Sequence, residues 1–324
     1  MLRTTLSTSE LSREQARVRQ KAKSKLARFW DRNKVAYLFL SPWMLGILLF
    51  SLIPILASLY LAFTNYDLFT RPSWIGVDNF THMFTRNPRY LKSLQVTFRY
   101  VFFGVPLQLL TALMLALVLN RGIPGLPLFR AVFYVPSLMG GSVAIALLWR
   151  RLFGYDGVLN QFLMFLGFEF DRPISWVTDP RFSLYTLIIL LVWAFGSPMI
   201  IFLAGLKQIP SELYEAASMD GAKPVSSFFY ITLPLLTPII FFNLVMQIIS
   251  AFQAFTPAFI VGGGTTGGPL DSLLFYTLYL YFLGFVECRM GYASAMAWIL
   301  LLIIMFFTTL LFLSSRWWVY YGDE

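Results

Sequence analysis

Hydrophobic residues gather in six long stretches of the chain, and polar residues are largely confined to the segments between them. Each stretch has the roughly 20 residues that a helix needs to cross a bilayer core. The stretches are apolar on all sides and lack the alternation of barrel strands, so a helix is the structure that satisfies their backbone in lipid. We predict six membrane-spanning helices, at about residues 35–63, 96–119, 131–149, 184–206, 235–255 and 292–313.

The composition supports this prediction and excludes other classes of protein. Of the 324 residues, 58% are hydrophobic and 13% are charged, which is about half the charged share of soluble domains. A water-soluble protein of this size could not cover its surface with so few polar side chains. Because the chain has one His and one Cys, a His/Cys metal cluster and an internal disulfide are excluded.

Basic residues concentrate before the first span. Residues 1–34 contain ten lysines and arginines but only three acidic residues. The positive-inside rule therefore places the N-terminus in the cytoplasm, and six spans return the C-terminus to the same side. Four arginines in the predicted external loop between spans three and four oppose this assignment, but the N-terminal block is larger: Arg150, Arg151, Arg172 and Arg181.

The chain is thus predicted to have three parts. A basic cytoplasmic segment covers residues 1–34, the six-helix domain covers residues 35–315, and a short cytoplasmic tail covers residues 316–324. The basic segment is either an amphipathic helix in the headgroup layer or a solvated tail that only sets the topology. The first apolar run is longer than that of a signal peptide, so we expect a retained anchor.

The predicted spans contain no Asp or Glu, and Arg99 is the one basic residue well inside a span. Proton- or sodium-driven transporters and voltage sensors use buried charges, so the sequence disfavours them. It also contains no visible set of catalytic side chains, and we do not expect an enzyme. The glycine-rich run at residues 262–269 lacks the lysine of a phosphate-binding loop. If the protein uses ATP, a separate ATPase subunit must bind it.

The loop at residues 207–234, predicted to be cytoplasmic, is more than a polar linker. Ser211 is predicted to cap a short helix, and Gly221 is placed to end it. Small residues would form one apolar face beside Glu215. Such a helix suits docking into a groove on a partner protein, but it could also pack on its own bundle, and these residues alone leave both open.

The same loop carries a recognisable signature: Glu215-Ala216-Ala217, Asp220-Gly221-Ala222, Ile231 and Leu233-Pro234. This run resembles the EAA loop of permease subunits in binding-protein-dependent ABC importers, in the spelling of the sugar-importer, maltose-type branch. The resemblance extends over about residues 35–315, and an insertion of Thr265-Thr266-Gly267 departs from the family pattern. Further matching segments are 74–80, Phe129-Arg130 with Pro136, 148–149 with 157–160, and 291–295.

This resemblance implies an all-α integral membrane protein with the type I ABC importer permease fold, in the cytoplasmic (inner) membrane. Its implied partners are a second homologous permease, two ATPase subunits and an extracytoplasmic solute-binding protein. The chain itself would bind no cofactor, because ATP and Mg²⁺ belong to the ATPase, and it would act by alternating access. The implied ATPase-coupling residues are Glu215, Ala216, Ala217, Asp220 and Gly221, with Glu215 as the polar anchor.

A carbohydrate cargo needs aromatic faces and hydrogen-bonding groups, and the resemblance places spans four and five around the cavity. Pro198 is expected to kink span four and free backbone carbonyls. In span five, three polar residues share one helical face by their i, i+4, i+7 spacing. They either line the cavity or only hold the bundle together, and Trp193 could equally pack in the core. The candidate cavity residues are Trp193, Ser197, Asn243, Gln247, Ser250 and Gln253.

The sequence therefore predicts the permease subunit of an ATP-driven ABC importer for an oligosaccharide. Overall, the chain most resembles permeases for alginate or a similar acidic oligosaccharide, although its spans offer almost no basic group to an anionic cargo. The competing interpretation is a stand-alone secondary transporter or channel for a small polar solute. Loss of transport on removal of a co-encoded ATPase would separate the two.

Overall fold

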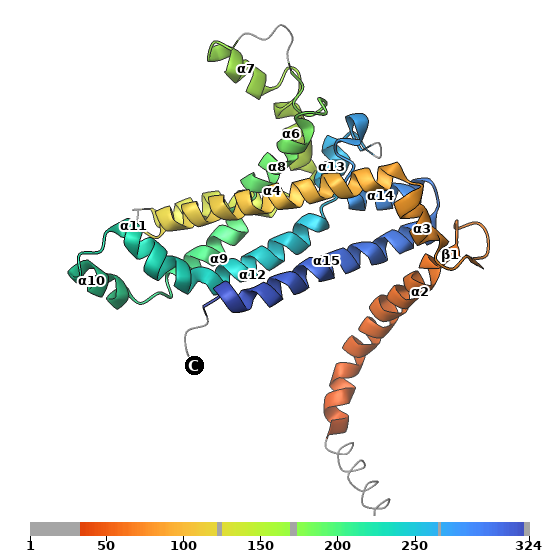
Figure 1. Ribbon diagram of the computed structural model, residues 1–324, viewed down its shortest axis with the longest axis horizontal. Coiled ribbons are helices and arrows are strands. Elements are labelled where there is room, and N and C mark those ends of the chain that lie inside the picture. The colour runs from red at the N-terminus through yellow and green to blue at the C-terminus, as the bar shows by residue number, and fades with distance from the viewer. Residues whose placement is uncertain (1–32, 122–124, 169–173, 265–266, 321–324) are drawn as a thin grey trace, which may run out of the picture. The chain divides into compact units, whose positions relative to one another are not determined.

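The computed structural model describes residues 33–121, 125–168, 174–264 and 267–320. These residues are mostly helical, with one two-stranded antiparallel sheet (Figure 1). The basic segment predicted at residues 1–34 lies outside the described residues except for its last two. The chain divides into two compact units, Met1–Tyr60 and Leu61–Glu324.

The first predicted span is a continuous helix, Asn33–Ala62. One of its turns, η1 at Leu48–Leu52, is a π-helix, and α2 at Ile53–Ala62 completes the span. Pro54 lies just after the π-turn. Because proline has no N–H to donate to the preceding turn, the regular hydrogen-bond ladder is interrupted where the helix widens.

Each of the six predicted spans overlaps one of six apolar helical segments of the described residues, and the shorter apolar helix Tyr276–Val286 lies outside the predicted spans. Four of these segments are single helices long enough to cross a membrane, and two are bent pairs that complete the six if each pair counts as one span. The segments are Asn33–Ala62, Pro88–Leu119, Pro127–Met139 with Val143–Leu152, Ser183–Trp193 with Gly196–Leu206, Pro224–Phe252, and Met290–Trp318.

The third span is sharply bent, so two helices replace the single one expected at residues 131–149. Helices α5 (Leu126–Met139) and α6 (Val143–Leu152) meet at 97°. Gly140 and Gly141 lie at the break, and a Cβ on Gly140 would lie 2.9 Å from that of Ala194, so a glycine lets the bend pack closely against the end of α8 (Ser183–Trp193). The Ser142 hydroxyl then accepts the Ile145 N–H at 3.3 Å and caps α6.

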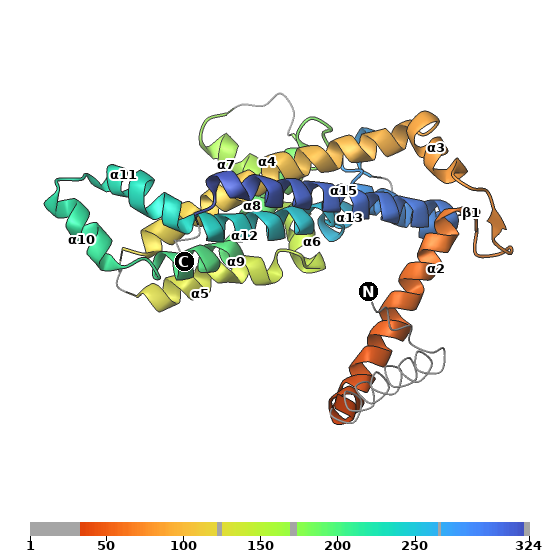
Figure 2. The ribbon, with the colours of Figure 1, turned by 60° about the horizontal axis from the view of Figure 1, so that its bottom comes forward.

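Helix α4 (Pro88–Leu119) forms the centre of the second unit. It contacts α8 (Ser183–Trp193), α9 (Gly196–Leu206) and α12 (Leu233–Phe252), and α15 (Met290–Trp318) packs on α12. Figures 1 and 2 both show α4, α12 and α15 side by side. The buried face of α4 carries small residues that allow this close packing, Gly104, Ala112 and Ala116.

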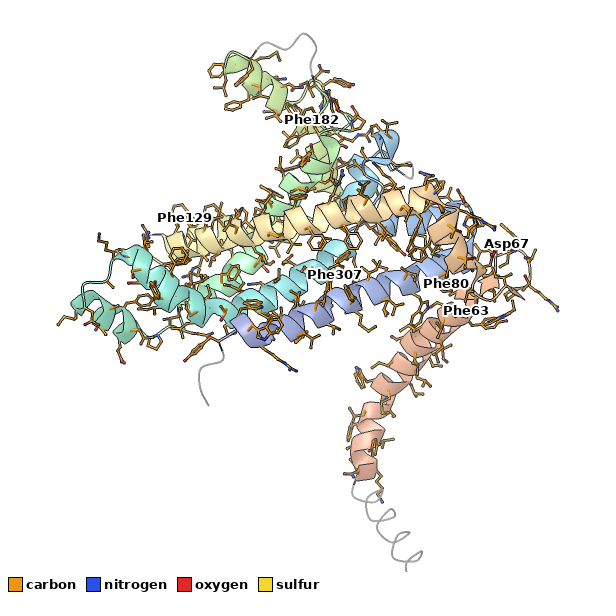
Figure 3. The ribbon with its side chains drawn as sticks, viewed as in Figure 1. Phe63, Asp67, Phe80, Phe129, Phe182 and Phe307 are labelled. Atoms are coloured by element: carbon orange, nitrogen blue, oxygen red, sulfur yellow. The ribbon has the colours of Figure 1, made fainter. Side chains whose placement is uncertain are left out.

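A hairpin and a short helix form one end of the second unit. Strands β1 (Thr64–Asn65) and β2 (Ser73–Trp74) pair in antiparallel register, and α3 follows at Asp78–Thr85. The Phe63 ring lies 5.5 Å from that of Trp74 and 5.3 Å from that of Phe80. Figure 3 shows Phe63 and Phe80 together here, at the opposite end from Phe129.

The remaining elements are short. They are α7 (Val158–Phe165), α10 (Ser211–Met219), α11 (Pro224–Ser227), η2 (Phe228–Thr232), α13 (Thr256–Val261), η3 (Pro269–Asp271), α14 (Tyr276–Tyr281) and η4 (Phe282–Val286). Helix α11, the π-turn η2 and α12 form one continuous helix over Pro224–Phe252. The segment after α10 therefore runs from the α10 end of the unit into its interior without a break.

Candidate functional site

Helix α10 carries three of the five predicted coupling residues, Glu215, Ala216 and Ala217, and has no buried residue. Asp220 is its C-cap, and Gly221 follows. The helix lies beyond the end of the helical bundle, beside α11 (Figures 1 and 2). Pro210 occupies the N-cap position, so Ser211 is the first helical residue and not the cap that the sequence predicts. The Tyr214 hydroxyl lies 2.9 Å from the Thr232 hydroxyl and links α10 to the long helix that follows.

Helix α10 ends in a Schellman motif. The Gly221 N–H donates to the Ser218 carbonyl at 3.1 Å, and the Ala222 N–H donates to the Ala217 carbonyl at 2.9 Å. Gly221 has a φ of +77°, a left-handed conformation that glycine adopts without a Cβ clash. The predicted end of the helix at Gly221 is confirmed.

The side chains of α10 point largely into solvent. Glu215, Ala216, Asp220 and Gly221 are exposed, and Ala217 is half-buried. Neither the Glu215 carboxylate nor that of Asp220 forms a hydrogen bond or an ion pair with another described residue. An exposed helix with one of these carboxylates on its surface and the other at its C-cap can present both to a partner protein.

A cavity of about 530 Å³ lies within the second unit, between α4, α5, α8, α9, α12 and α13. Four of the six candidate residues line it. Ser197 comes from α9, Gln247 and Ser250 come from α12, and Gln253 follows directly after α12. The residues that line this cavity include hydroxyl, amide and aromatic side chains but no charged side chain.

The break between α8 and α9 forms part of the cavity wall. Pro198 has no N–H to donate to the Ala194 carbonyl four residues earlier, so that carbonyl is free, as the sequence predicts. It accepts hydrogen bonds from Gln108 Nε2 at 3.0 Å and from Ser137 Oγ at 2.9 Å. Ser137 Oγ also accepts the Ser197 N–H at 2.8 Å. Side chains from α4 and α5 thus satisfy the backbone of a bent span.

The cavity residues on α4, α5 and α13 lie outside spans four and five and are not among the candidates that the sequence predicts. Tyr100, Gln108, Ser137 and Thr256 all line the cavity. Gln108 could have been found, since an amide in the middle of an apolar span is costly to bury without a role. It is only 2% exposed, and its Oε1 has no hydrogen-bond partner among the described residues.

The other two candidates, Trp193 and Asn243, do not line the cavity. The Trp193 ring packs against that of Trp149, with the centroids 5.5 Å apart, as the core-packing alternative expects. Asn243 is 1% exposed, and neither polar atom of its amide has a hydrogen-bond partner in the part of the chain that the structure describes. It therefore provides no interhelical hydrogen bond there either.

Several signature residues outside α10 have a structural role. A Cβ on Gly291 would lie 2.1 Å from the Thr64 carbonyl, so only glycine fits there. The Asn79 amide donates to the Thr64 carbonyl at 3.0 Å. Asn160 is buried, and its amide donates to the Ile174 carbonyl at 2.7 Å. These residues stabilise loops and helix contacts, so the family pattern at these positions reflects the shared fold.

Known proteins resemble this chain over nearly its whole length. The family described as "Binding-protein-dependent transport system inner membrane component" matches residues 33–319. The "Probable ABC transporter permease protein YesP" of Bacillus subtilis is 56% identical, over 89% of this chain and 93% of that protein. The "Lactose transport system permease protein LacF" of Rhizobium radiobacter is 33% identical, over 86% of this chain and 93% of that protein.

A solved structure shares the fold. It is a chain of a bacterial ABC transporter involved in the import of the acidic polysaccharide alginate, and it superposes with a TM-score of 0.77. The match covers 90% of this chain and 98% of that chain, with 22% sequence identity. At this identity the similarity establishes the fold and says nothing about the cargo.

Proposed function

Because the chain belongs to the family of binding-protein-dependent transport system inner membrane components, we propose that it is the permease subunit of an ATP-driven ABC importer for an oligosaccharide. The relative named for lactose transport supports a carbohydrate cargo. The observation that carries the proposal is the combination, in one chain, of an interior cavity with a polar, uncharged wall and an exposed helix α10.

The helices offer a mechanical route between these two features. Helix α10 would dock on the ATPase through Glu215, with Ala216 and Ala217 allowing close approach. The Tyr214–Thr232 hydrogen bond joins α10 to the continuous helix Pro224–Phe252, and that helix carries cavity residues on its far half. Closure of the ATPase dimer would therefore move the cavity wall as a rigid body and switch its access.

The cargo would be recognised by hydrogen bonds. The polar groups of the cavity can donate to and accept from sugar hydroxyls, and its aromatic side chains can pack on sugar rings. The more specific proposal for the cargo is an acidic oligosaccharide such as alginate. Since the cavity residues of this chain contribute no charge, the countercharge for an acidic cargo would come from the second permease or the binding protein.

In the proposed assembly, this chain lies in the lipid bilayer and has five partners. They are a second homologous permease, two ATPase subunits that bind ATP and Mg²⁺, an extracytoplasmic solute-binding protein and its oligosaccharide. The chain would cross the inner membrane six times. The N-terminus, the C-terminus and the end of the bundle next to α10 would face the cytoplasm. The positive charge before the first span supports this orientation.

Deletion of the ATPase subunit is expected to abolish uptake, because the spans contain no buried carboxylates for ion coupling. Calorimetry on the binding protein with lactose, an alginate trisaccharide and other oligosaccharides first identifies the cargo. Uptake of the radiolabelled cargo is then measured in cells with and without the ATPase, and an ATPase variant that cannot hydrolyse ATP serves as the matched control. Uptake that persists in both strains would instead indicate a stand-alone transporter.

A further inference from the structure

Asn243 is a buried amide without a partner. It is 1% exposed, and its Oδ1 and Nδ2 are both shielded from solvent with no hydrogen bond to any described residue. An amide can donate two hydrogen bonds and accept two, and native proteins leave few buried polar groups unpaired. A leucine of similar size would pack at this site without that penalty. A conformation in which this amide meets polar partners would account for its presence.

The position of Asn243 points to the cavity. Asn243, Gln247 and Ser250 lie on one face of α12 by their i, i+4, i+7 spacing, and the latter two line the cavity. Exposure falls along this face toward α10, since Ser250 is exposed, Gln247 is half-buried and Asn243 is buried. Asn243 is thus one helical turn, about 6 Å, beyond the last cavity residue of α12 on the α10 side.

Helices α9 and α12 close tightly just beyond Asn243. A Cβ on Gly205 would lie 2.0 Å from Ile239 Cδ1 and 3.1 Å from Leu236 Cδ1, so the aliphatic side chains of α12 rest against the backbone of α9. The three atoms nearest to this position are aliphatic, and aliphatic surfaces can separate without breaking hydrogen bonds. Gly205, Leu236 and Ile239 do not line the cavity, so this contact lies outside its wall.

Helix α12 also has a weak point at this level. Pro238 cannot donate to the Pro234 carbonyl, which instead accepts the Thr237 hydroxyl at 2.6 Å. A missing backbone hydrogen bond inside a helix is one of the recognised causes of bending. The helix can therefore bend at Pro238, five residues before Asn243.

We propose that Asn243 lines the transport pathway in the conformation in which α9 and α12 separate, where its amide binds hydroxyl groups of the passing carbohydrate. The cavity would then extend by one turn toward α10, and the unpaired amide would find its partners in solute and water. This inference rests on the proposed function, because separation of the two helices requires the transport cycle.

Cysteine labelling tests the exposure of this position. In the assembled complex in lipid nanodiscs, Cys288, the one native cysteine of the chain, is replaced by serine and Asn243→Cys is introduced. The water-soluble reagent 2-aminoethyl methanethiosulfonate is applied without nucleotide and after trapping with ATP and vanadate. We expect at least about a tenfold difference in the labelling rate between the two states, as for a switch between a closed and an open population.

Two control positions give the labelling its meaning. Ser250→Cys lines the cavity and should react in at least one state, whereas Leu278→Cys is fully buried in α14 and should react in neither. If the labelling of Ser250→Cys differs between the two states and Asn243→Cys never reacts, the inference is overturned and the proposed function stands. If ATP and vanadate produce no state-dependent labelling at either position, the proposed function fails and the inference fails with it.

A second variant keeps the inference testable if the cysteine disturbs the fold. Asn243→Leu removes the unpaired amide, so it should stabilise the closed α9–α12 contact. The melting temperature of the nucleotide-free complex should rise, while ATP hydrolysis stimulated by the binding protein should fall, with Asn243→Gln closer to wild type in both. A complex with Asn243→Leu that hydrolyses ATP at the wild-type rate would overturn the inference.

Discussion

Single polar side chains stabilise this fold where a proline interrupts a helix. Pro198 frees the Ala194 carbonyl, and the side chains of Gln108 and Ser137 bind it. Pro238 frees the Pro234 carbonyl in the same way, and a local threonine binds that one. The two solutions differ in range, because the first joins three helices and the second stays within one turn. Only the first also contributes polar groups to the cavity wall.

The hydrogen bonding of the Gln108 amide is therefore expected to contribute more to stability and uptake than the volume of the side chain does. Gln108→Leu removes the hydrogen bond to the Ala194 carbonyl and should lower the stability of the purified complex by about 1–2 kcal/mol. It should also reduce uptake, since the cavity loses an amide. Thermal unfolding and transport assays measure the two effects. Gln95→Leu, the same substitution at an exposed position of α4, should change neither. Equal effects of the two variants would refute this role.

At the scale of the elements, close contacts between helices depend on positions without a Cβ. The α5–α9 contact is the tightest against backbone, because a Cβ on Gly196 would lie 2.5 Å from the Phe133 carbonyl oxygen and 2.8 Å from Tyr134 Cα. The α9–α12 contact at Gly205 is different, since there the Cβ would meet the mobile end of the Ile239 side chain. A glycine against backbone cannot be replaced without moving a helix.

Alanine substitution should distinguish these two contacts. Gly196→Ala forces α5 away from α9 and is expected to destabilise the complex by about 3 kcal/mol, at the upper end of the usual effect of overpacking. Gly205→Ala should cost less, because Ile239 can change rotamer. Thermal unfolding of the purified variants gives the comparison, with Gly141→Ala as the control because no atom lies within 4 Å of its new Cβ. A Gly196 variant as stable as this control would contradict the contact.

At the scale of the whole molecule, the second unit has a cavity with polar, uncharged side chains in its wall and an exposed helix that lies outside the bundle. Helix α10 has no buried residue, so packing within this chain places few constraints on its sequence. A continuous helix leads from the end of α10 to the cavity. This arrangement suits a protein whose interior is driven from outside by another subunit. It also means that a change in α10 should affect transport without affecting the spans.

Ala217→Trp is the variant that tests this separation. The large ring should prevent α10 from docking, so ATP hydrolysis and uptake should be uncoupled while the spans stay folded. Uptake of the cargo, the ATPase rate and the thermal stability of the permease are measured together. Ala217→Ser, which keeps the side chain small, is expected to behave as wild type. Normal uptake by the tryptophan variant would contradict the coupling role of α10.

The sequence alone determines the spans and the short helix α10. Insertion into lipid depends on the apolar character of about 20 consecutive residues, which is a local property and can be read directly. The end of α10 is local as well, since Gly221 supplies a backbone conformation that other residues adopt with strain. The signature in this loop also resembles the family to which the chain belongs.

Only the tertiary structure decides which polar residues meet at the cavity. Gln108 reaches a carbonyl 86 residues away and Ser137 one 57 residues away, so neither partner follows from a local pattern. Trp193 has the aromatic face and Asn243 the polarity and spacing expected of cavity residues, yet packing around α8 and α12 keeps them from its wall. Hydrophobic periodicity identifies the face of a helix that turns inward. The neighbouring helices determine whether that face meets a cavity or a packed contact, because they supply the opposing surface.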